Sequence, residues 1–228
     1  MPRPRAVVIF SAHWESPVLS LTNPGERHET IHDFYGFPDE LYDIQYPAPG
    51  APETVDALEA LFSAAGIPCL NTSRGLDHGA WVVLRLLFPQ CDVPVVQASL
   101  NPSLSPAEQY RIGQAVAPLR QQDVLVIGSG ATVHNLRMLD WENQQPDRVA
   151  TWARQFDDWL VEKVGQWDTF SLFAYEAAAP NAAMAVPRNE HFVPLFIAMG
   201  AADPGRKASL LHRSYEMGCL SMMAWQFD

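Results

Sequence analysis

The sequence predicts an α/β fold in which a largely parallel or mixed central sheet is flanked by helices. Short runs of purely apolar residues, which are typical of strands buried on both faces, recur along the chain. Segments with apolar residues at helical spacing lie between these runs. Strands that alternate with helices favour parallel pairing, because the helix carries the chain back across the sheet.

The expected strands are short and mostly uninterrupted by polar residues. An alternating segment, 18–22, is a further candidate, and the stretch 219–227 is expected to return to the same sheet. The apolar runs are Ala6–Phe10, Val93–Leu100 and Val124–Ile127.

The expected helices carry recognisable start and stop signals. A glycine, Gly66, follows the first of them, and an aspartate, Asp77, precedes the second. The third opens with Ser-Pro-Ala-Glu, which supplies a serine N-cap, a proline in the first turn and a glutamate for a capping box. A fourth, amphipathic helix is expected to open with Pro146. The four ranges are 52–65, 77–88, 105–119 and 146–164.

Two segments do not fit a helix or a strand. The stretch 23–50 is long and rich in aromatic residues, proline and glycine, and long ordered loops of this kind are usually functional. We expect it to form a pocket wall with His32 facing inward. The stretch 176–189 is rich in small residues and is expected to be a second loop.

Composition and charge bound the function. The 228 residues are 48% hydrophobic and 18% charged, which suits a single domain spanning 1–228. A net charge of −11 argues against nucleic acid and against an anionic membrane surface as partners. The apolar run near the N-terminus is too short for a signal peptide. The three widely spaced cysteines form neither a zinc pattern nor a disulfide set, so we expect a reducing, cytoplasmic location.

Two of the seven histidines follow apolar strands directly. His13 comes three residues after Phe10, and His134 closes the stretch VLVIGSGATVH. Because ligands bind at the carboxyl ends of strands in open α/β sheets, both imidazoles are expected where chemistry occurs. His32, His78 and His191 lie beside helix starts or in the long loop. His28 and His212 have polar neighbours and are expected to be solvated.

Imidazoles from separate loops without cysteine partners suit Fe(II) or Zn(II). The spacing alone is a weak signal, because no two histidines form a short ligand motif. Glu15, Glu29 and Glu190 each lie close to a histidine and are expected to be surface carboxylates. The turn 128–130 is neither a nucleophile elbow nor a phosphate loop. Aromatic residues near the histidines suggest a pocket for a flat ligand; they are Trp14, Phe34, Tyr35, Phe37, Trp81 and Phe192.

Several longer stretches, taken together and in order, are more specific than any single histidine. They are SAHW, TIHDFYGFP, LYDIQYPAPG, LDHGAWVVLRLLFP, VPVVQASL, GSGATVHNLR, EHFVPLFIAMGAA and YEMGCLSM. From about Ala6 to the C-terminus, the sequence closely resembles the class III (LigB-type) extradiol ring-cleavage dioxygenases, in the DOPA-dioxygenase-like branch.

The resemblance implies a non-haem metal centre, normally Fe(II), with Zn(II) in some isolated members. It implies that His13 and His191 are metal ligands. It implies that His134 lies beside the metal as acid and base, where it can also bind zinc, and that His78 lies in the substrate pocket. The implied reaction opens a catechol ring with O₂ and gives a muconic semialdehyde.

The sequence departs from the family at one point. Members begin with a strand that ends in a Gly-His-Gly-like motif, whose histidine is a metal ligand, and the sequence has no such motif. We therefore expect that the family's first strand is missing and that in-frame DNA before Met1 encodes it. The short form should be poorly active, bind metal substoichiometrically and self-associate through an exposed strand edge.

Two other functions stay open on the sequence. One is a LigB-fold metal-binding or regulatory protein with an impaired site and no dioxygenase activity. The other is a zinc hydrolase that uses the same histidines around an activated water, which the absence of an obvious carboxylate base disfavours. His28 and His32 are the first residues to consider as replacements for the missing ligand.

Overall fold

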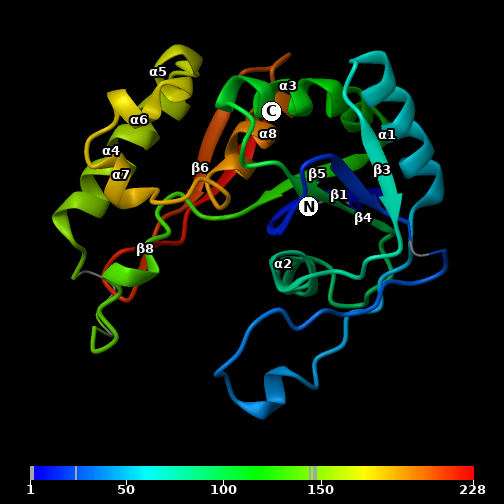
Figure 1. The fold of residues 1–228 in the computed structure, drawn as a ribbon, viewed down its shortest axis with the longest axis horizontal. Helices are drawn as coiled ribbons and strands as arrows, with labels where there is room; N and C mark the ends of the chain where they lie inside the picture. Colours follow the sequence, from blue (N-terminus) through cyan, green and yellow to red (C-terminus); the bar gives the residue numbers. More distant parts are fainter. Residues whose placement is uncertain (1–2, 24, 144, 146–147) are drawn as a thin grey trace.

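The computed structural model describes residues 3–23, 25–143, 145 and 148–228. Its central sheet has the strand order β3-β2-β4-β1-β5. β1 pairs in parallel with β4 and β5, and β2 pairs in parallel with β3 but antiparallel with β4. The predicted α/β fold with a mixed sheet is therefore confirmed (Figure 1). The strands are β1 (Ala6–Glu15), β2 (Leu19–Thr22), β3 (Cys69–Thr72), β4 (Val95–Leu100) and β5 (Val124–Ser129).

Helices cover both faces of this sheet (Figure 1). Val8 and Phe10 of β1 point to one face, where they join a core with α1 (Pro52–Ala64), α3 (Pro106–Val116) and α8 (Val193–Ala201). Val7 and Ile9 point to the other face, against α2 (His78–Leu87) and the end of the long loop. Because both faces are buried, β1 reads as an uninterrupted apolar run.

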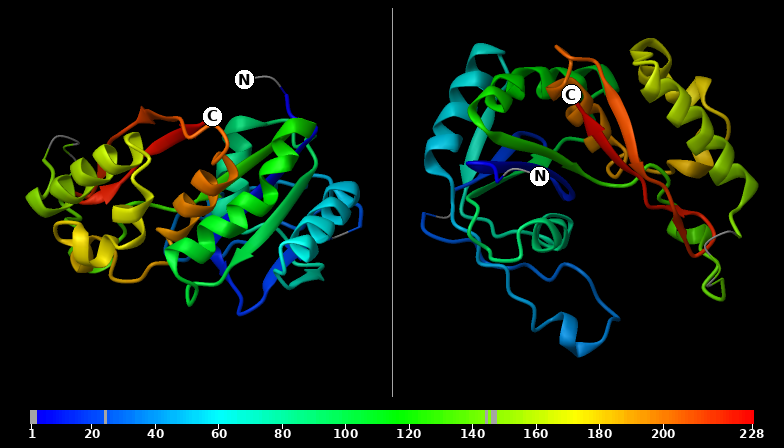
Figure 2. Two further views of the ribbon diagram at one scale, coloured as in Figure 1. Left: turned by 90° about the horizontal axis from the view of Figure 1, so that it is seen from above. Right: turned by 180° about the vertical axis from the view of Figure 1, so that it is seen from behind.

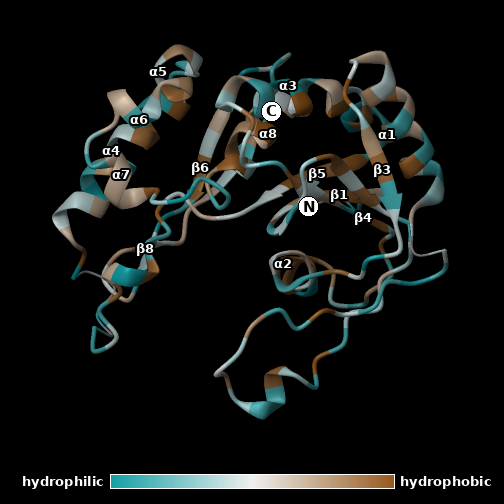
Figure 3. Cartoon of the chain, in the orientation of Figure 1, coloured by the Kyte–Doolittle hydropathy of each residue, from teal (hydrophilic) through white to brown (hydrophobic). Residues whose placement is uncertain are grey.

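A second group of elements packs against the outer side of α8. It comprises four helices and two small antiparallel ribbons, β6–β9 and β7–β8, and it lies at the opposite end of the long axis from α1 (Figure 2). Phe192, Phe196 and Met199 join its core, while Val193 and Ile197 join the core of the sheet. α8 is therefore buried on both sides, which explains its nearly continuous apolar sequence (Figure 3). The group comprises α4 (Thr151–Gly165), α5 (Thr169–Phe173), α6 (Tyr175–Ala178), α7 (Ala182–Ala185), β6 (Ala208–His212), β7 (Tyr215–Glu216), β8 (Leu220–Ser221) and β9 (Ala224–Phe227).

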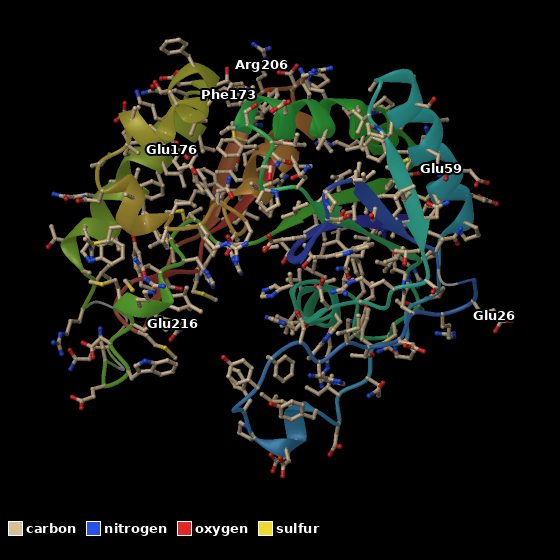
Figure 4. The ribbon with its side chains drawn as sticks, viewed as in Figure 1. Glu26, Glu59, Phe173, Glu176, Arg206 and Glu216 are labelled. Carbon is tan, nitrogen blue, oxygen red and sulfur yellow. The ribbon has the colours of Figure 1, made fainter. Side chains whose placement is uncertain are left out.

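Three short 3₁₀ helices complete the secondary structure of the described residues: η1 (Asp39–Leu41), η2 (Ala117–Gln122) and η3 (Leu136–Met138). Figure 4 shows two of the acidic residues, Glu26 and Glu59, at the outer edge of the fold. The described residues contain no helix that is both long enough and apolar enough to cross a membrane.

Two strand predictions are wrong in instructive ways. β1 continues to Glu15, so that His13 lies within the strand and not beyond its end; the pairing register with β4 shifts between Phe10 and Glu15. The stretch 219–227 does not return to the central sheet, because β8 and β9 pair with β7 and β6 instead. The sequence analysis identified neither β3 nor β6.

The predicted helix ends are confirmed where the capping signal lies within a few residues of the helix end. The capping box of α3 is present, with Ser105 and Glu108 bonded to each other's backbone N–H, and Gly66 follows α1 with a positive φ of 69°. By contrast, α4 begins at Thr151, well after the predicted start, and Pro146 is outside the described residues. The stretch 176–189 is also not a loop throughout, since it contains most of α6 and all of α7.

Candidate metal centre

Four of the seven imidazoles meet at the carboxyl ends of β1 and β5. His13 lies near the end of β1, His78 is the first residue of α2, His134 follows β5, and His191 precedes α8. The ring centroids are 3.8 Å apart for His13 and His78, 4.9 Å for His13 and His191, and 3.5 Å for His134 and His191. The structure thus brings together all four histidines that the sequence analysis selected for the site.

A buried carboxylate fixes the place of His13. The Asp77 side chain is fully buried and accepts hydrogen bonds from Ser11 Oγ (2.7 Å) and from Gln97 Nε2 of β4. The Ser11 hydroxyl in turn accepts the His13 backbone N–H at 3.2 Å. Asp77 also caps α2 by accepting the Ala80 N–H. One buried side chain therefore aligns the end of β1 with the start of α2, which carries His78.

Glycines allow the close approach of the segments that carry His134 and His191. A Cβ on Gly130 would collide with the His191 carbonyl, and one on Gly128 would collide with the Pro194 carbonyl. The Ala131 N–H donates to His191 O at 2.8 Å, so the turn after β5 is bonded to the segment before α8. This contact accounts for the two glycines, but the predicted turn at 128–130 is wrong, because Gly128 and Ser129 are the last residues of β5. The hydroxyl between the two glycines, on Ser129, donates to Gly79 O at 2.6 Å.

Glu190 orients the ring of His191. Its Oε1 lies 3.0 Å from His191 Nδ1, and the side chain is only 12% exposed. Arg188 lies 3.3 Å from the other carboxylate oxygen and also binds Glu15 on β1 at 2.6 Å. The prediction that Glu190 is a surface carboxylate is therefore wrong, whereas Glu15 and Glu29 are exposed as predicted. With the proton held on Nδ1, the His191 Nε2 lone pair is available to a cation.

Asp33 plays a similar part on the opposite side of the cluster, and the sequence analysis missed it. Its Oδ1 lies 3.0 Å from His78 Nδ1 and accepts the His78 backbone N–H at 2.8 Å, while its Oδ2 lies 3.5 Å from His13 Nδ1. Burial alone would raise the pKa of Asp33, but the hydrogen bonds and charge of His78 lower this pKa to about 2. The carboxylate is therefore ionised at neutral pH beside two imidazoles.

The three imidazoles expected around the metal all have a lowered pKa. Burial lowers the pKa of His13 and of His134, and the neighbouring His78 lowers that of His13 further. The pKa of His191 falls to about 4, first because of burial and then because of the neighbouring His134. All three rings are therefore neutral at pH 7, which is the form that binds a metal ion.

The geometry of His13 and His191 fits a shared metal ion. Their Nε2 atoms are 3.3 Å apart and their rings are nearly perpendicular, at 87°. Two nitrogens bound to one tetrahedral ion at about 2.0–2.1 Å lie about 3.3–3.4 Å apart, so the observed spacing matches. Carboxylates lie within reach in two groups of potential ligands, His13–Asp33–His78 and His134–Glu190–His191, and the donor atoms within each group are within 4.8 Å of one another.

His134 has a different relation to the cluster. Its ring stacks on that of His191 with an angle of only 10° between the planes. The nitrogen lone pairs of an imidazole lie in its ring plane, and the planes of two stacked rings do not meet, so these two imidazoles do not converge on one ion unless one ring turns. His134 therefore lies beside the pair formed by His13 and His191, and its ring nitrogens do not point to the place where theirs converge.

The remaining histidines lie outside the cluster. His28 is buried, with Nε2 2.9 Å from Val95 O, so the prediction that it is solvated is wrong. His32 Nε2 lies 2.9 Å from Ile44 O, and its ring contacts Trp81. Both rings thus hold the long loop to the rest of the fold. His212 is exposed, as predicted.

A pocket of about 320 Å³ opens beside His78, between the long loop and α2. Phe34 and Trp81 line it, whereas Tyr35, which the sequence analysis also expected at a ligand pocket, is 91% exposed and is not among the lining residues. Phe192 lies instead in the core around α8, so its assignment to a ligand pocket is wrong. Trp14 carries the Arg74 guanidinium over its ring at 5.2 Å. The full lining is Phe34, Phe37, Leu41, Ile44, His78, Trp81, Val82, Arg85 and Leu86.

Comparison with known proteins connects this arrangement to one family. Residues 1–224 match the family described as the catalytic LigB subunit of aromatic ring-opening dioxygenase. A 4,5-DOPA dioxygenase extradiol from Beta vulgaris is 42% identical over 99% of the chain and 83% of its own length, and one from Escherichia coli K12 is 34% identical over the same shares. The crystal structure of an uncharacterized Escherichia coli K12 protein, JW3007, superimposes with a TM-score of 0.83 at 31% identity, covering all of this chain and 88% of that one.

Proposed function

This chain belongs to the LigB family of aromatic ring-opening dioxygenases, and we propose that its substrate is a catechol of the DOPA type. It is an extradiol dioxygenase, which opens an aromatic ring beside its pair of hydroxyl groups with O₂. The substrate proposal is supported by the 4,5-DOPA dioxygenase names of relatives that are 34–42% identical.

We propose that His13 and His191 hold the metal ion, which we take to be Fe(II). The observation that carries this proposal is the 3.3 Å spacing of their Nε2 atoms on perpendicular rings, one near the end of β1 and the other just before α8. When bound, Fe(II) supplies the redox chemistry that activates O₂ and a Lewis acid for the two catechol oxygens. Glu190 holds the proton of His191 on Nδ1 and so keeps Nε2 directed at the ion.

His134 is proposed as the acid and base. Its lowered pKa keeps the ring neutral at pH 7, so it accepts the proton of a catechol hydroxyl and later returns it to the opening ring. The parallel stacking on His191 fits this part better than ligation, because the ring is beside the donor pair without pointing to the same place. Ligation of Zn(II) by His134 would require its ring to turn.

His78 is proposed to orient the substrate. Its ring lies 3.8 Å from His13 on one side and 5.6 Å from Phe34 on the other, so it stands between the metal ligands and the apolar pocket. Asp33, close to Nδ1, leaves Nε2 of His78 available for a hydrogen bond with a catechol oxygen or with the dioxygen unit. Phe34 and Trp81 give the aromatic ring an apolar wall and exclude water.

The test combines metal content with ring cleavage. The protein is loaded with Fe(II) without oxygen, and DOPA and air are then added while the yellow semialdehyde is followed by absorbance. We expect His13→Ala to lose both bound iron and activity, and the matched variant His212→Ala, which alters an exposed histidine outside the cluster, to keep both. Efficient cleavage by the His13→Ala variant would remove His13 from the ligand set.

A further inference from the structure

We infer that Arg85 determines which side chain the substrate carries: it binds a carboxylate at the end of a short carbon chain attached to the catechol ring. This inference rests on the proposed function and extends it from the reacting ring to the substituent. The feature that carries it is the pocket beside His78, which is apolar along its walls and has a single permanent cation in its lining.

The pocket is continuous with the site at His78. That residue lines the pocket and also lies 3.8 Å from the His13 ring, measured between centroids. Phe34 packs edge-on against His78 at 5.6 Å, so the pocket begins where the proposed ring site ends. A substituent that points away from the hydroxyl pair of the catechol therefore enters this pocket.

The walls suit a carbon chain. Val82 and Leu86 on α2 are 39% and 81% exposed, and Phe37 and Leu41 on the loop are 56% and 37% exposed. Exposed apolar side chains on both walls of one pocket indicate a surface that is covered by an apolar group of a ligand. The substrate's own methylene chain is such a group, and it reaches the pocket whenever the ring occupies the site.

Arg85 gives the pocket its charge. In the part of the chain that the structure describes, the Arg85 guanidinium has neither a carboxylate within ion-pair distance nor a hydrogen bond, whereas Arg188, Arg206 and Arg213 each contact an acid. None of the nine residues that line the pocket is acidic. Among the described residues Arg111 and Arg137 also lack an ion pair, but neither lines this pocket, whereas Arg85 does and offers five donors to a carboxylate.

The spacing along α2 sets the length of the substituent. His78 and Arg85 are seven residues apart, which corresponds to about 10 Å of helix. The long methylene stem of Arg85 can span part of this distance. The remaining span suits a chain of two or three carbons that ends in a carboxylate, and it places a terminal ammonium group against a like charge.

The first test compares three catechols that differ only in the end of the chain. They are 3-(3,4-dihydroxyphenyl)propanoate, 4-ethylcatechol and dopamine, and the measured quantity is the ratio of their kcat/KM values. We expect Arg85→Gln to lower the propanoate-to-ethylcatechol ratio by about tenfold, and Arg85→Glu to make dopamine the best of the three. Arg111→Gln, which removes an equal charge from an exposed position on α3, controls for net charge.

The second test does not use turnover. Binding of 3-phenylpropanoate, which lacks the hydroxyl pair, is measured by calorimetry on the metal-free protein, with 2-phenylethylamine as the opposite charge. We expect the acid to bind more tightly than the amine, and this preference to disappear in Arg85→Gln.

The two tests separate this inference from the proposed function. If catechols are cleaved but neither the ratio nor the binding preference changes in Arg85→Gln, the inference is wrong and the proposed function stands. If no catechol is cleaved while 3-phenylpropanoate binding depends on Arg85, the inference about the pocket stands and the proposed function fails. If there is neither cleavage nor binding of the acid, both are overturned.

Discussion

The two sides of the candidate site are built in different ways. His13, His134 and His191 lie on or next to β1, β5 and α8, whose backbones are fixed by sheet pairing and by the close glycine contacts after β5. The opposite side, with Asp33 and the pocket wall, comes from the loop 23–50. In the described part of that loop, only η1 is helical, and the loop is joined to other segments by isolated bridges, by side-chain hydrogen bonds such as that of Tyr46 to Phe88 O, and by packing in the core around α2.

Each side also uses a carboxylate to orient an imidazole, and the two carboxylates differ. Glu190 adjoins His191 in the sequence and is 12% exposed, whereas Asp33 reaches His78 across the fold and is 23% exposed. The comparison teaches that the residues proposed to hold the metal depend on regular backbone pairing. The residues that face the substrate depend on a loop, which can change its side chains without disturbing the sheet.

The largest effect is expected from His191→Ala, which removes one of the two proposed metal ligands. Loss of one of two converging nitrogens should reduce metal affinity by well over the roughly 10–100-fold that loss of an orienting partner costs, and turnover should fall with it. Metal content after dialysis, measured by mass spectrometry, checks this. Stoichiometric iron in the variant would show that His191 does not hold the metal.

The next largest effect is expected from His134, which lies beside the pair formed by His13 and His191. His134→Ala should lose about 10²–10⁴-fold in kcat because a general acid and base is removed, while at least part of the metal stays bound. The readouts are single-turnover kinetics and metal content. Near-normal turnover would exclude His134 from the reaction, and complete loss of metal would assign it to the ligands.

The two carboxylates give a direct contrast. Glu190→Gln should weaken metal binding by roughly 10–100-fold, because the ionised acceptor that orients His191 is replaced by a neutral amide. Asp33→Asn should change metal affinity less and lower kcat/KM for catechols, because Asp33 lies closer to His78 Nδ1, at 3.0 Å, than to His13 Nδ1, at 3.5 Å. Metal affinity and kcat/KM are measured on both variants by metal titration and steady-state kinetics. If the two variants lose metal affinity and kcat/KM to the same extent, the two carboxylates do not differ in function.

Acid should first destabilise the folded protein through His191, one of the two proposed metal ligands. His191 is neutral in the folded protein, with a pKa of about 4, and titrates at about 6.5 when unfolded, so the unfolded chain binds more protons between these values. The stability that depends on this ring is complete above pH 6.5 and is lost as the pH falls toward 4, by at most about 3 kcal/mol. Thermal unfolding of the metal-free protein across this range should show a steeper decline than that of His191→Ala.

The smallest effect is expected on the loop side. Phe34→Ala should raise KM for catechols by about threefold to tenfold, because an apolar wall of the pocket is lost, with a smaller change in kcat. Tyr35→Ala provides the matched control, since that ring is 91% exposed and should affect neither constant. A large fall in melting temperature with unchanged KM would show that Phe34 serves only the core.

The sequence by itself determined the features that depend on interactions within a few residues. The capping box of α3 is predictable because Ser105 and Glu108 are three residues apart, and the buried strands are predictable because burial on both faces demands an apolar run. The four site histidines could be selected because each belongs to a motif at a strand end or a helix start.

Only the tertiary structure decided what depends on partners remote in the sequence. The extension of β1 through His13 requires pairing of Glu15 with Leu100, and the separation of β9 from the central sheet requires β6 as its neighbour. Glu190 is buried because Arg188 holds it while reaching Glu15, which is 173 residues away along the chain. The sequence around each residue contains no trace of such contacts, since the free energy that favours them arises only when the segments are packed together.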